Sequence, residues 1–179
     1  MRFAYADPPY IGQARKHYRK HPDYAGEVDH EALIARLVAE YPDGWALSLS
    51  CKSLRQILAM CPADVRVMAW VKPLTPLLPG IRVQYGWEPV IVRGGRQPRP
   101  AKGAPMLRDW VSASPDGWAF RPKPEGHVIG RKPEAFCRWL FAVLGLESGD
   151  EFVDLFPGSG AVGRAWDAWR AQAPLGLGA

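Results

Sequence analysis

Four residues near the start of the chain, Asp7-Pro8-Pro9-Tyr10, directly follow the apolar stretch Phe3-Ala4-Tyr5-Ala6. A carboxylate and a backbone carbonyl only accept hydrogen bonds, so Asp7 and the Pro8 carbonyl could together hold both hydrogens of an amine. Two such acceptors favour a tetrahedral, nucleophilic nitrogen. The prolines stiffen the loop, and Tyr10 offers a flat surface on which a base can stack. These residue types indicate chemistry at the exocyclic amine of a base.

A second motif near the other end of the chain has the pattern of a strand, a glycine turn and a helix. Glu151 to Phe156 is a mostly apolar run, and Pro157-Gly158-Ser159-Gly160 follows it. Glycines let the backbone approach a ligand closely, and Asp154 can accept hydrogen bonds from a ligand ammonium group. The pattern therefore predicts a loop that binds a cofactor.

Both motifs directly follow a predicted strand. In open α/β sheets, ligands bind beyond the carboxyl ends of the strands. We therefore predict that the two strands are neighbours in the middle of the sheet, so that the cofactor and the target amine would meet there. A plain strand ending in a Pro-Pro turn is the alternative explanation of the first motif.

Together these residues resemble the S-adenosylmethionine-dependent amino-methyltransferases, whose signatures are D-P-P-Y and an aspartate followed by F-x-G-S-G. The resemblance is closest to the adenine-N6 DNA methyltransferases in which the catalytic motif precedes the cofactor motif, and Lys132-Pro133-Glu134 matches the K-P helix of that subgroup. It implies a Rossmann-like α/β fold with permuted motif order, a mostly parallel sheet and an antiparallel hairpin at one edge. The cofactor that it implies is S-adenosylmethionine. The implied catalytic residues are Asp7, Pro8, Pro9 and Tyr10, and the implied cofactor-binding residues are Lys132, Asp154, Phe156, Gly158, Ser159 and Gly160.

The run from Gly158 to Gly163 also satisfies the G-x-G-x-x-G pattern of dinucleotide-binding folds. That pattern requires a second strand and an acidic residue about 20 residues further on. Neither is present, since no acid follows Asp167. Nicotinamide binding is therefore disfavoured. The same absence leaves the ribose of S-adenosylmethionine without the acidic partner that family members usually provide.

Apolar periodicity predicts alternating strands and helices over the rest of the chain. The expected strands are Arg2 to Ala6, Trp45 to Leu49, Val65 to Val71, and a hairpin of Arg82 to Tyr85 with Pro89 to Val92. Helices are expected at Leu33 to Tyr41, at Leu54 to Cys61, and from Lys132-Pro133-Glu134, where Trp139 has the spacing of a core residue. Lys72 follows a strand, and we assign it no catalytic role.

Length and composition favour one domain over residues 1–179, because a chain with 47% hydrophobic residues can build a substantial core. Cys51, Cys61 and Cys137 lack metal-ligand spacing, so we expect reduced core cysteines and no metal site. The absence of a signal peptide and of a bilayer-length apolar run favours a cytoplasmic protein without a membrane partner.

The excess of basic residues gives a modest bias toward a polyanionic partner, and the resemblance implies that this partner is DNA. The net charge is +5, and a basic insertion at about 93–123 occupies the position of the target-recognition region in the similar family. Its prolines and glycines argue against regular structure, and a disordered linker is the alternative. Ile11 to Val28 is a second basic segment, which we expect to cover the site. The candidate nucleic-acid-binding residues are Arg15, Lys16, Arg93, Arg96, Arg99 and Lys102.

The expected function is therefore site-specific methylation of the adenine N6 amine in DNA by direct in-line attack, with no metal and no covalent nucleophile. Methylation of cytosine N4, or of an RNA or nucleotide amine, needs the same acceptor geometry and remains open. So does a non-catalytic nucleic-acid-binding subunit with the same fold. A homodimer or a separate specificity subunit is left open as the protein partner.

Overall fold

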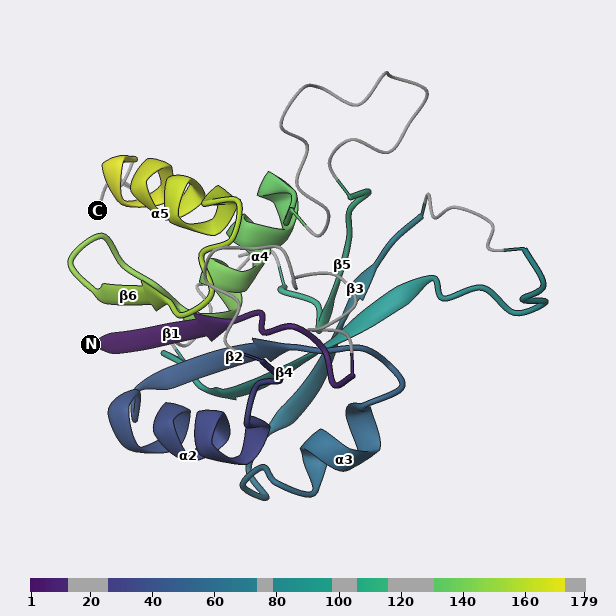
Figure 1. The fold of residues 1–179 in the computed structure, drawn as a ribbon. Helices are drawn as coiled ribbons and strands as arrows, with labels where there is room; N and C mark the ends of the chain where they lie inside the picture. Colours follow the sequence, from purple (N-terminus) through teal and green to yellow (C-terminus); the bar gives the residue numbers. More distant parts are fainter. Residues whose placement is uncertain (13–25, 74–78, 98–105, 116–130, 173–179) are drawn as a thin grey trace.

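A single six-stranded sheet forms the centre of the molecule in the computed structural model, which describes residues 1–12, 26–73, 79–97, 106–115 and 131–172 (Figure 1). The strands are β1 (Arg2–Ala6), β2 (Gly44–Ser48), β3 (Arg66–Val71), β4 (Trp87–Gly94), β5 (Trp110–Ser112) and β6 (Glu151–Asp154). Their spatial order is β5-β3-β4-β2-β1-β6.

Pairing within the sheet is mostly parallel, as the sequence predicts. β1 pairs in parallel with β2 and β6, and β3 pairs in parallel with β5. β4 is antiparallel to both of its neighbours, β2 and β3. All the strands except β4 therefore run in the same direction, and their carboxyl ends lie at one edge of the sheet.

The predicted edge hairpin is wrong in two respects. Arg82 to Tyr85 forms no strand, and β4 lies inside the sheet, where it pairs with β3 from Trp87 opposite Val71. The physical reason is burial. Val83 and Tyr85 are exposed, whereas Pro89 to Val92 are buried and therefore favour an interior position.

Helices cover both faces of the sheet (Figure 1). They are α2 (His30–Glu40) and α3 (Leu54–Leu58) on one face, and α4 (Glu134–Leu144) and α5 (Ala161–Ala171) on the other. Successive side chains of a strand point to opposite faces. Accordingly, Phe3 and Tyr5 of β1 pack with α4, whereas Ala4 and Ala6 pack with α2 and α3.

Most of the predicted elements are confirmed, with ends that differ by a few residues. The basic insertion is an exception, because it contains a regular strand, β5, which pairs with β3. Trp139 is a core residue as predicted. The three cysteines form no disulfide with one another, and of the three only Cys137 is fully buried. Among the described residues, no helix is long and apolar enough to cross a membrane.

Candidate active site

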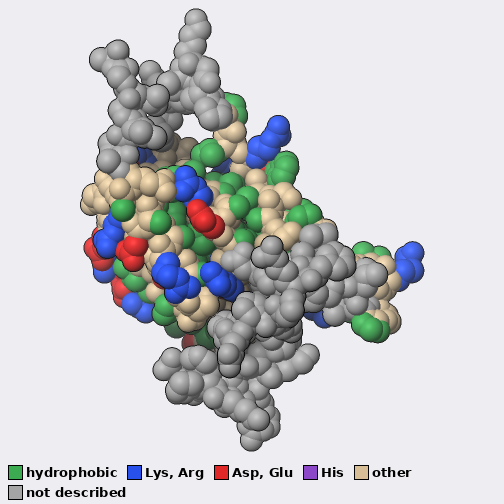
Figure 2. Space-filling view, turned by 90° about the horizontal axis from the view of Figure 1, so that it is seen from above, with side chains coloured by type: hydrophobic (Ala, Val, Ile, Leu, Met, Phe, Trp, Pro, Cys, Tyr) green, Lys and Arg blue, Asp and Glu red, His purple; other side chains and the backbone are tan. Residues whose placement is uncertain are grey.

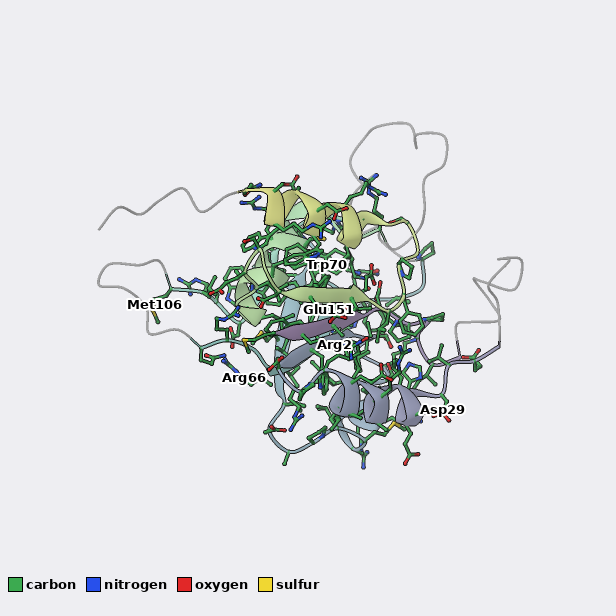
Figure 3. The ribbon with its side chains drawn as sticks, turned by 90° about the vertical axis from the view of Figure 1, so that its left-hand side faces the viewer. Arg2, Asp29, Arg66, Trp70, Met106 and Glu151 are labelled. Carbon is green, nitrogen blue, oxygen red and sulfur yellow. The ribbon has the colours of Figure 1, made fainter. Side chains whose placement is uncertain are left out.

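The two sequence motifs meet at the carboxyl edge of neighbouring strands. β1 and β6 are paired in register, with Tyr5 opposite Asp154, and the Leu155 N–H donates to the Tyr5 carbonyl at 2.9 Å. Their first residues, Arg2 and Glu151, lie side by side as well (Figure 3). The predicted adjacency of the strands is therefore confirmed. Their predicted place in the middle of the sheet is wrong, because β6 is the edge strand of the described sheet.

Asp7 forms an ion pair with a lysine from the second half of the chain. Lys132 Nζ lies 2.5 Å from Asp7 Oδ2, and the lysine side chain is only 4% exposed. Burial raises the pKa of Asp7, and the Lys132 ammonium opposes that rise. Lys132 immediately precedes the buried Pro133 and helix α4, so packing of this helix fixes where the ammonium lies.

Tyr10 is held at its hydroxyl end by an acid on β4. The Tyr10 hydroxyl donates to Glu88 Oε2 at 2.9 Å, and Lys72 Nζ contacts the other oxygen, Oε1. Burial, followed by the negative charges of Asp7 and Glu88, raises the pKa of Tyr10 well above its ordinary value. This contact was not expected from the sequence, in which Glu88 directly precedes the predicted strand Pro89 to Val92.

Trp70 lies between the two lysines of the site. The Lys72 and Lys132 ammonium groups lie 4.5 and 5.3 Å from its ring centroid, distances typical of cation–π contacts. Its indole N–H donates to the Ala113 carbonyl at 2.8 Å. Trp70 belongs to the apolar cluster under α4 and α5 (Figure 3), so a rigid core side chain supports both cations.

Asp154 presents a buried acceptor oxygen toward this edge of the sheet. Oδ1 accepts a hydrogen bond from the Phe156 N–H at 3.3 Å, whereas Oδ2 is buried and has no hydrogen-bond partner among the described residues. Burial raises the pKa of Asp154 to about 6, and the Phe156 N–H opposes the shift. A buried, unpaired carboxylate oxygen is costly, and a cationic donor would compensate it.

The glycine loop connects Asp154 to α5 and leaves room for a ligand. Gly158 and Gly160 have φ of 45° and 70°, and the Gly160 N–H donates to the Pro157 carbonyl at 2.6 Å. A Cβ at Gly158 would meet only the Phe156 carbonyl oxygen, at 3.8 Å. The space beside Gly158 is therefore open. Asp154 and this loop fit a ligand that has an ammonium group and approaches the backbone closely.

Of the six basic residues expected to bind nucleic acid, the two that the structure describes, Arg93 and Arg96, do not lie at this edge. Arg93 pairs with Trp45 near the start of β2, so it lies at the opposite edge of the sheet from Asp7, and it is ion-paired with Asp64 at 2.8 Å. Arg96 contacts Asp150, also at 2.8 Å. Arg15, Lys16, Arg99 and Lys102 lie outside the described residues.

The outer surface of α4 and α5 has mixed charge (Figure 2). Arg138 lies 3.9 Å from Glu134, and Arg170 lies 2.8 Å from Asp167. Opposite charges are interspersed on these two helices, which differs from the continuous basic surface expected where a protein follows a phosphate backbone.

Comparison with known proteins identifies the fold. No protein-family model and no curated protein sequence matches the chain. Among solved structures, the chain is similar to M1.HpyAVI in complex with SAM, with a TM-score of 0.58 and 17% identity over 94% of this chain and 77% of that one. It is also similar to a second structure of M1.HpyAVI, with a TM-score of 0.55 and 16% identity over 94% and 76%. The chain therefore shares a Rossmann-like α/β fold with M1.HpyAVI.

Proposed function

We propose that this chain is a methyltransferase that transfers a methyl group from S-adenosylmethionine to the N6 amine of adenine in DNA. One observation supports this function above the others. Asp7 directly follows β1, and Asp154, whose buried Oδ2 has no hydrogen-bond partner among the described residues, ends the neighbouring strand β6. A site that joins two substrates needs both binding places within reach of each other. The similarity in fold to M1.HpyAVI, which has been solved with SAM, agrees with this proposal.

The cofactor would be held by β6 and the loop after it. Asp154 would accept hydrogen bonds from the ammonium group. The rest of the cofactor would contact Phe156, Gly158, Ser159 and Gly160, and the space beside Gly158 is open. S-adenosylmethionine would supply an activated methyl group on its sulfonium. Lys132 was expected to contact the cofactor, but since its ammonium is bound to Asp7 we assign it to control of that carboxylate.

The acceptor amine would be bound by the loop after β1. Asp7 and the Pro8 carbonyl would accept its two hydrogens, so that the nitrogen lone pair points at the methyl carbon. Attack of the amine on the methyl carbon would form the N–C bond as the S–C bond broke, and the bonding electrons would remain on sulfur. The nitrogen then loses one proton, for which the Asp7 carboxylate is the nearest acceptor in this arrangement. Tyr10 would stack on the base.

Adenine and DNA as substrates rest on the D-P-P-Y resemblance and on the net charge of +5. Arg15, Lys16, Arg99 and Lys102 remain proposed DNA contacts. We do not include Arg93 and Arg96 among them, because both are ion-paired within the protein and lie at the far edge of the sheet.

The test is incubation with tritiated-methyl S-adenosylmethionine and unmodified double-stranded DNA, followed by nucleoside digestion and mass spectrometry. We expect labelled N6-methyldeoxyadenosine with the wild type and none with Asp7→Ala. Asp167→Ala is the matched control, because Asp167 is an exposed acid on α5 that pairs with Arg170 at the helix surface. Labelled N4-methyldeoxycytidine would mean that the target base is cytosine and not adenine. No label, with S-adenosylmethionine binding intact, would contradict DNA as the substrate.

A further inference from the structure

A chain of contacts leads from the interior of the sheet to the hydroxyl of Tyr10. Trp70 of β3 is fixed in the core, and Lys72, two residues further on, has its ammonium over the Trp70 ring. Lys72 pairs with Glu88 of β4, and Glu88 accepts the hydrogen bond from Tyr10. Two segments that are distant in sequence, β3 with Lys72 after it and β4 with Glu88, therefore support the hydroxyl of Tyr10.

Tyr10 needs such support because its own segment provides little. It follows the Pro8-Pro9 turn, and its backbone belongs to no helix or strand. A stacking ring acts on a reaction only if its plane is set relative to the bound base, since catalysis by positioning is lost with small displacements. A hydrogen bond at the far end of the phenol limits tilt of the ring. Glu88 lies on an interior strand and is therefore a rigid anchor.

Electrostatics explains why the two residues that support Tyr10 are a glutamate and a lysine. A carboxylate is the stronger acceptor for a phenol hydroxyl, because a hydrogen bond to an ionised group is roughly twice as strong as a neutral one. A second carboxylate near Asp7 has a cost, however, because the Glu88 charge raises the pKa of Asp7. Lys72 compensates that charge and lowers the pKa of Asp7. The Glu88 side chain is 20% exposed and that of Lys72 is 16% exposed, so solvent screens this pair only in part.

We propose that Glu88, neutralised by Lys72, is a positioning residue that fixes the Tyr10 ring for stacking on the target base. This inference rests on the proposed methyl transfer and adds two residues to it that lie outside both sequence motifs. Glu88 acts through Tyr10 and does not touch the reacting atoms.

A double-mutant cycle at Tyr10 and Glu88 tests this role. Tyr10→Phe keeps the ring and removes the hydroxyl, Glu88→Ala removes the acceptor, and each should lower kcat about tenfold. The double variant should also be about tenfold slower, because both changes remove the same contact. Glu88→Gln should stay within about threefold of the wild type, because its amide oxygen still accepts from Tyr10. Glu31→Ala, an exposed acid in α2, is the matched control.

Two outcomes of these measurements would contradict the proposal. A double variant slowed about a hundredfold would mean that Glu88 and Tyr10 act independently. Unchanged kcat in Glu88→Ala would also overturn the proposal. A folding defect is recognised separately, because a merely destabilised variant would lose active protein without the specific coupling to Tyr10 and without rescue by Glu88→Gln.

A measurement without substrate separates this inference from the proposed function. In protein labelled with fluorotyrosine, the ¹⁹F signal that Tyr10→Phe removes belongs to Tyr10. We expect Glu88→Ala to shift that signal at neutral pH and Glu31→Ala to leave it in place. A shift together with an inactive wild type would mean that the contact is real but the function is wrong. Methyl transfer without a shift would overturn the role of Glu88 alone.

Discussion

Asp154 is partly buried, and its buried oxygen Oδ2 has no hydrogen-bond partner among the described residues, which predicts an effect on stability. Its pKa is about 6 in the folded protein against an ordinary 3.8, so the folded state binds its proton more tightly than the unfolded state does. Protonation therefore stabilises the fold at low pH, and this contribution is lost as pH rises through about 6. Asp154→Asn should be more stable than the wild type at pH 8, by about 1 kcal/mol after allowance for partial exposure. Urea unfolding at pH 8 and pH 4 measures this, and an equal difference at both values would contradict it.

The same substitution should weaken cofactor binding. An amide can place its oxygen where Asp154 Oδ2 lies, but it has no charge for a ligand ammonium, so the affinity for S-adenosylmethionine should fall about tenfold or more. Isothermal titration calorimetry at pH 8 measures this, with Asp167→Asn as the control on the surface of α5. Unchanged affinity would mean that the ammonium is held elsewhere. Gained stability with lost affinity is typical of a binding residue.

Lys132→Met should shift the pH dependence of methyl transfer. The Lys132 ammonium lowers the pKa of Asp7 and so opposes burial, while the Glu88 charge raises that pKa and the Lys72 charge lowers it. Without Lys132 the pKa of Asp7 rises, so the carboxylate that accepts the amine hydrogens forms only at higher pH. Activity at pH 6 relative to pH 8 should therefore fall in Lys132→Met and not in Lys52→Met. An unchanged acid limb would exclude Asp7 as the group that controls it.

The residues at the ends of β1 and β6 were predictable because local sequence determines both motifs. A strand followed by Asp7-Pro8-Pro9 or by a glycine turn fixes where the acid lies relative to its own strand. Glu88 and Lys72 were not predictable as partners of Tyr10. Their contact depends on which strands pair across the sheet, and residues near in sequence do not specify that pairing.

At the scale of elements, the main error concerned β4. Its apolar run identified a strand correctly, but hydrophobic periodicity does not give strand order. Gly86-Trp87 suggested a tight turn, whereas β4 pairs with β3 across the longer segment that begins at Lys72. This pairing brings Glu88 to the carboxyl edge of the sheet. The wrong position predicted for β4 therefore also explains why Glu88 was not predicted as a partner of Tyr10.

Comparison of Gly158→Ala with Gly145→Ala should distinguish loss of space for a ligand from backbone strain. Gly158 and Gly145 both have positive φ, of 45° and 67°. Adding a Cβ there costs about 1–2 kcal/mol through the left-handed conformation alone. At Gly145 the Cβ would also meet the Arg96 carbonyl oxygen at 2.7 Å, whereas at Gly158 the space is open. Gly145→Ala should therefore lower the melting temperature more, and Gly158→Ala should weaken S-adenosylmethionine binding more. The reverse order in calorimetry and thermal unfolding would mean that the loop does not face the cofactor.

At the scale of the whole molecule, net charge and binding surface are different quantities. Arg93 and Arg96 contribute to the charge of +5, but they are paired with Asp64 and Asp150 within the fold. The net charge calculated from composition includes these two arginines, although their charges are paired within the fold and are not available to DNA. Only the fold distinguishes a structural arginine from one that can release counterions from a phosphate backbone.

The edge of the sheet opposite the site has its own acid, Asp150, which joins distant parts of the chain. It accepts from Arg96 at 2.8 Å and from the Glu147 N–H, also at 2.8 Å, and its side chain is 4% exposed. The hydrogen bond from Arg96 holds the pKa of Asp150 well below its usual range. The contact therefore stabilises the fold above the unfolded pKa of about 3.8, and the contribution is lost as pH falls through the folded pKa.

Asp150→Asn should consequently lower stability at pH 7 by about 1 kcal/mol, allowing for solvent screening, and the difference from wild type should shrink at more acidic pH. Thermal unfolding across pH measures it, with Glu147→Gln as a control because that carboxylate is 68% exposed and 3.5 Å from Arg96. S-adenosylmethionine affinity should be unchanged, because Asp150 precedes β6 whereas Asp154 ends it. If affinity fell together with stability, the two ends of the strands would be energetically coupled through β6. Residues at the amino ends of the strands would then influence the site as well as those at the carboxyl ends.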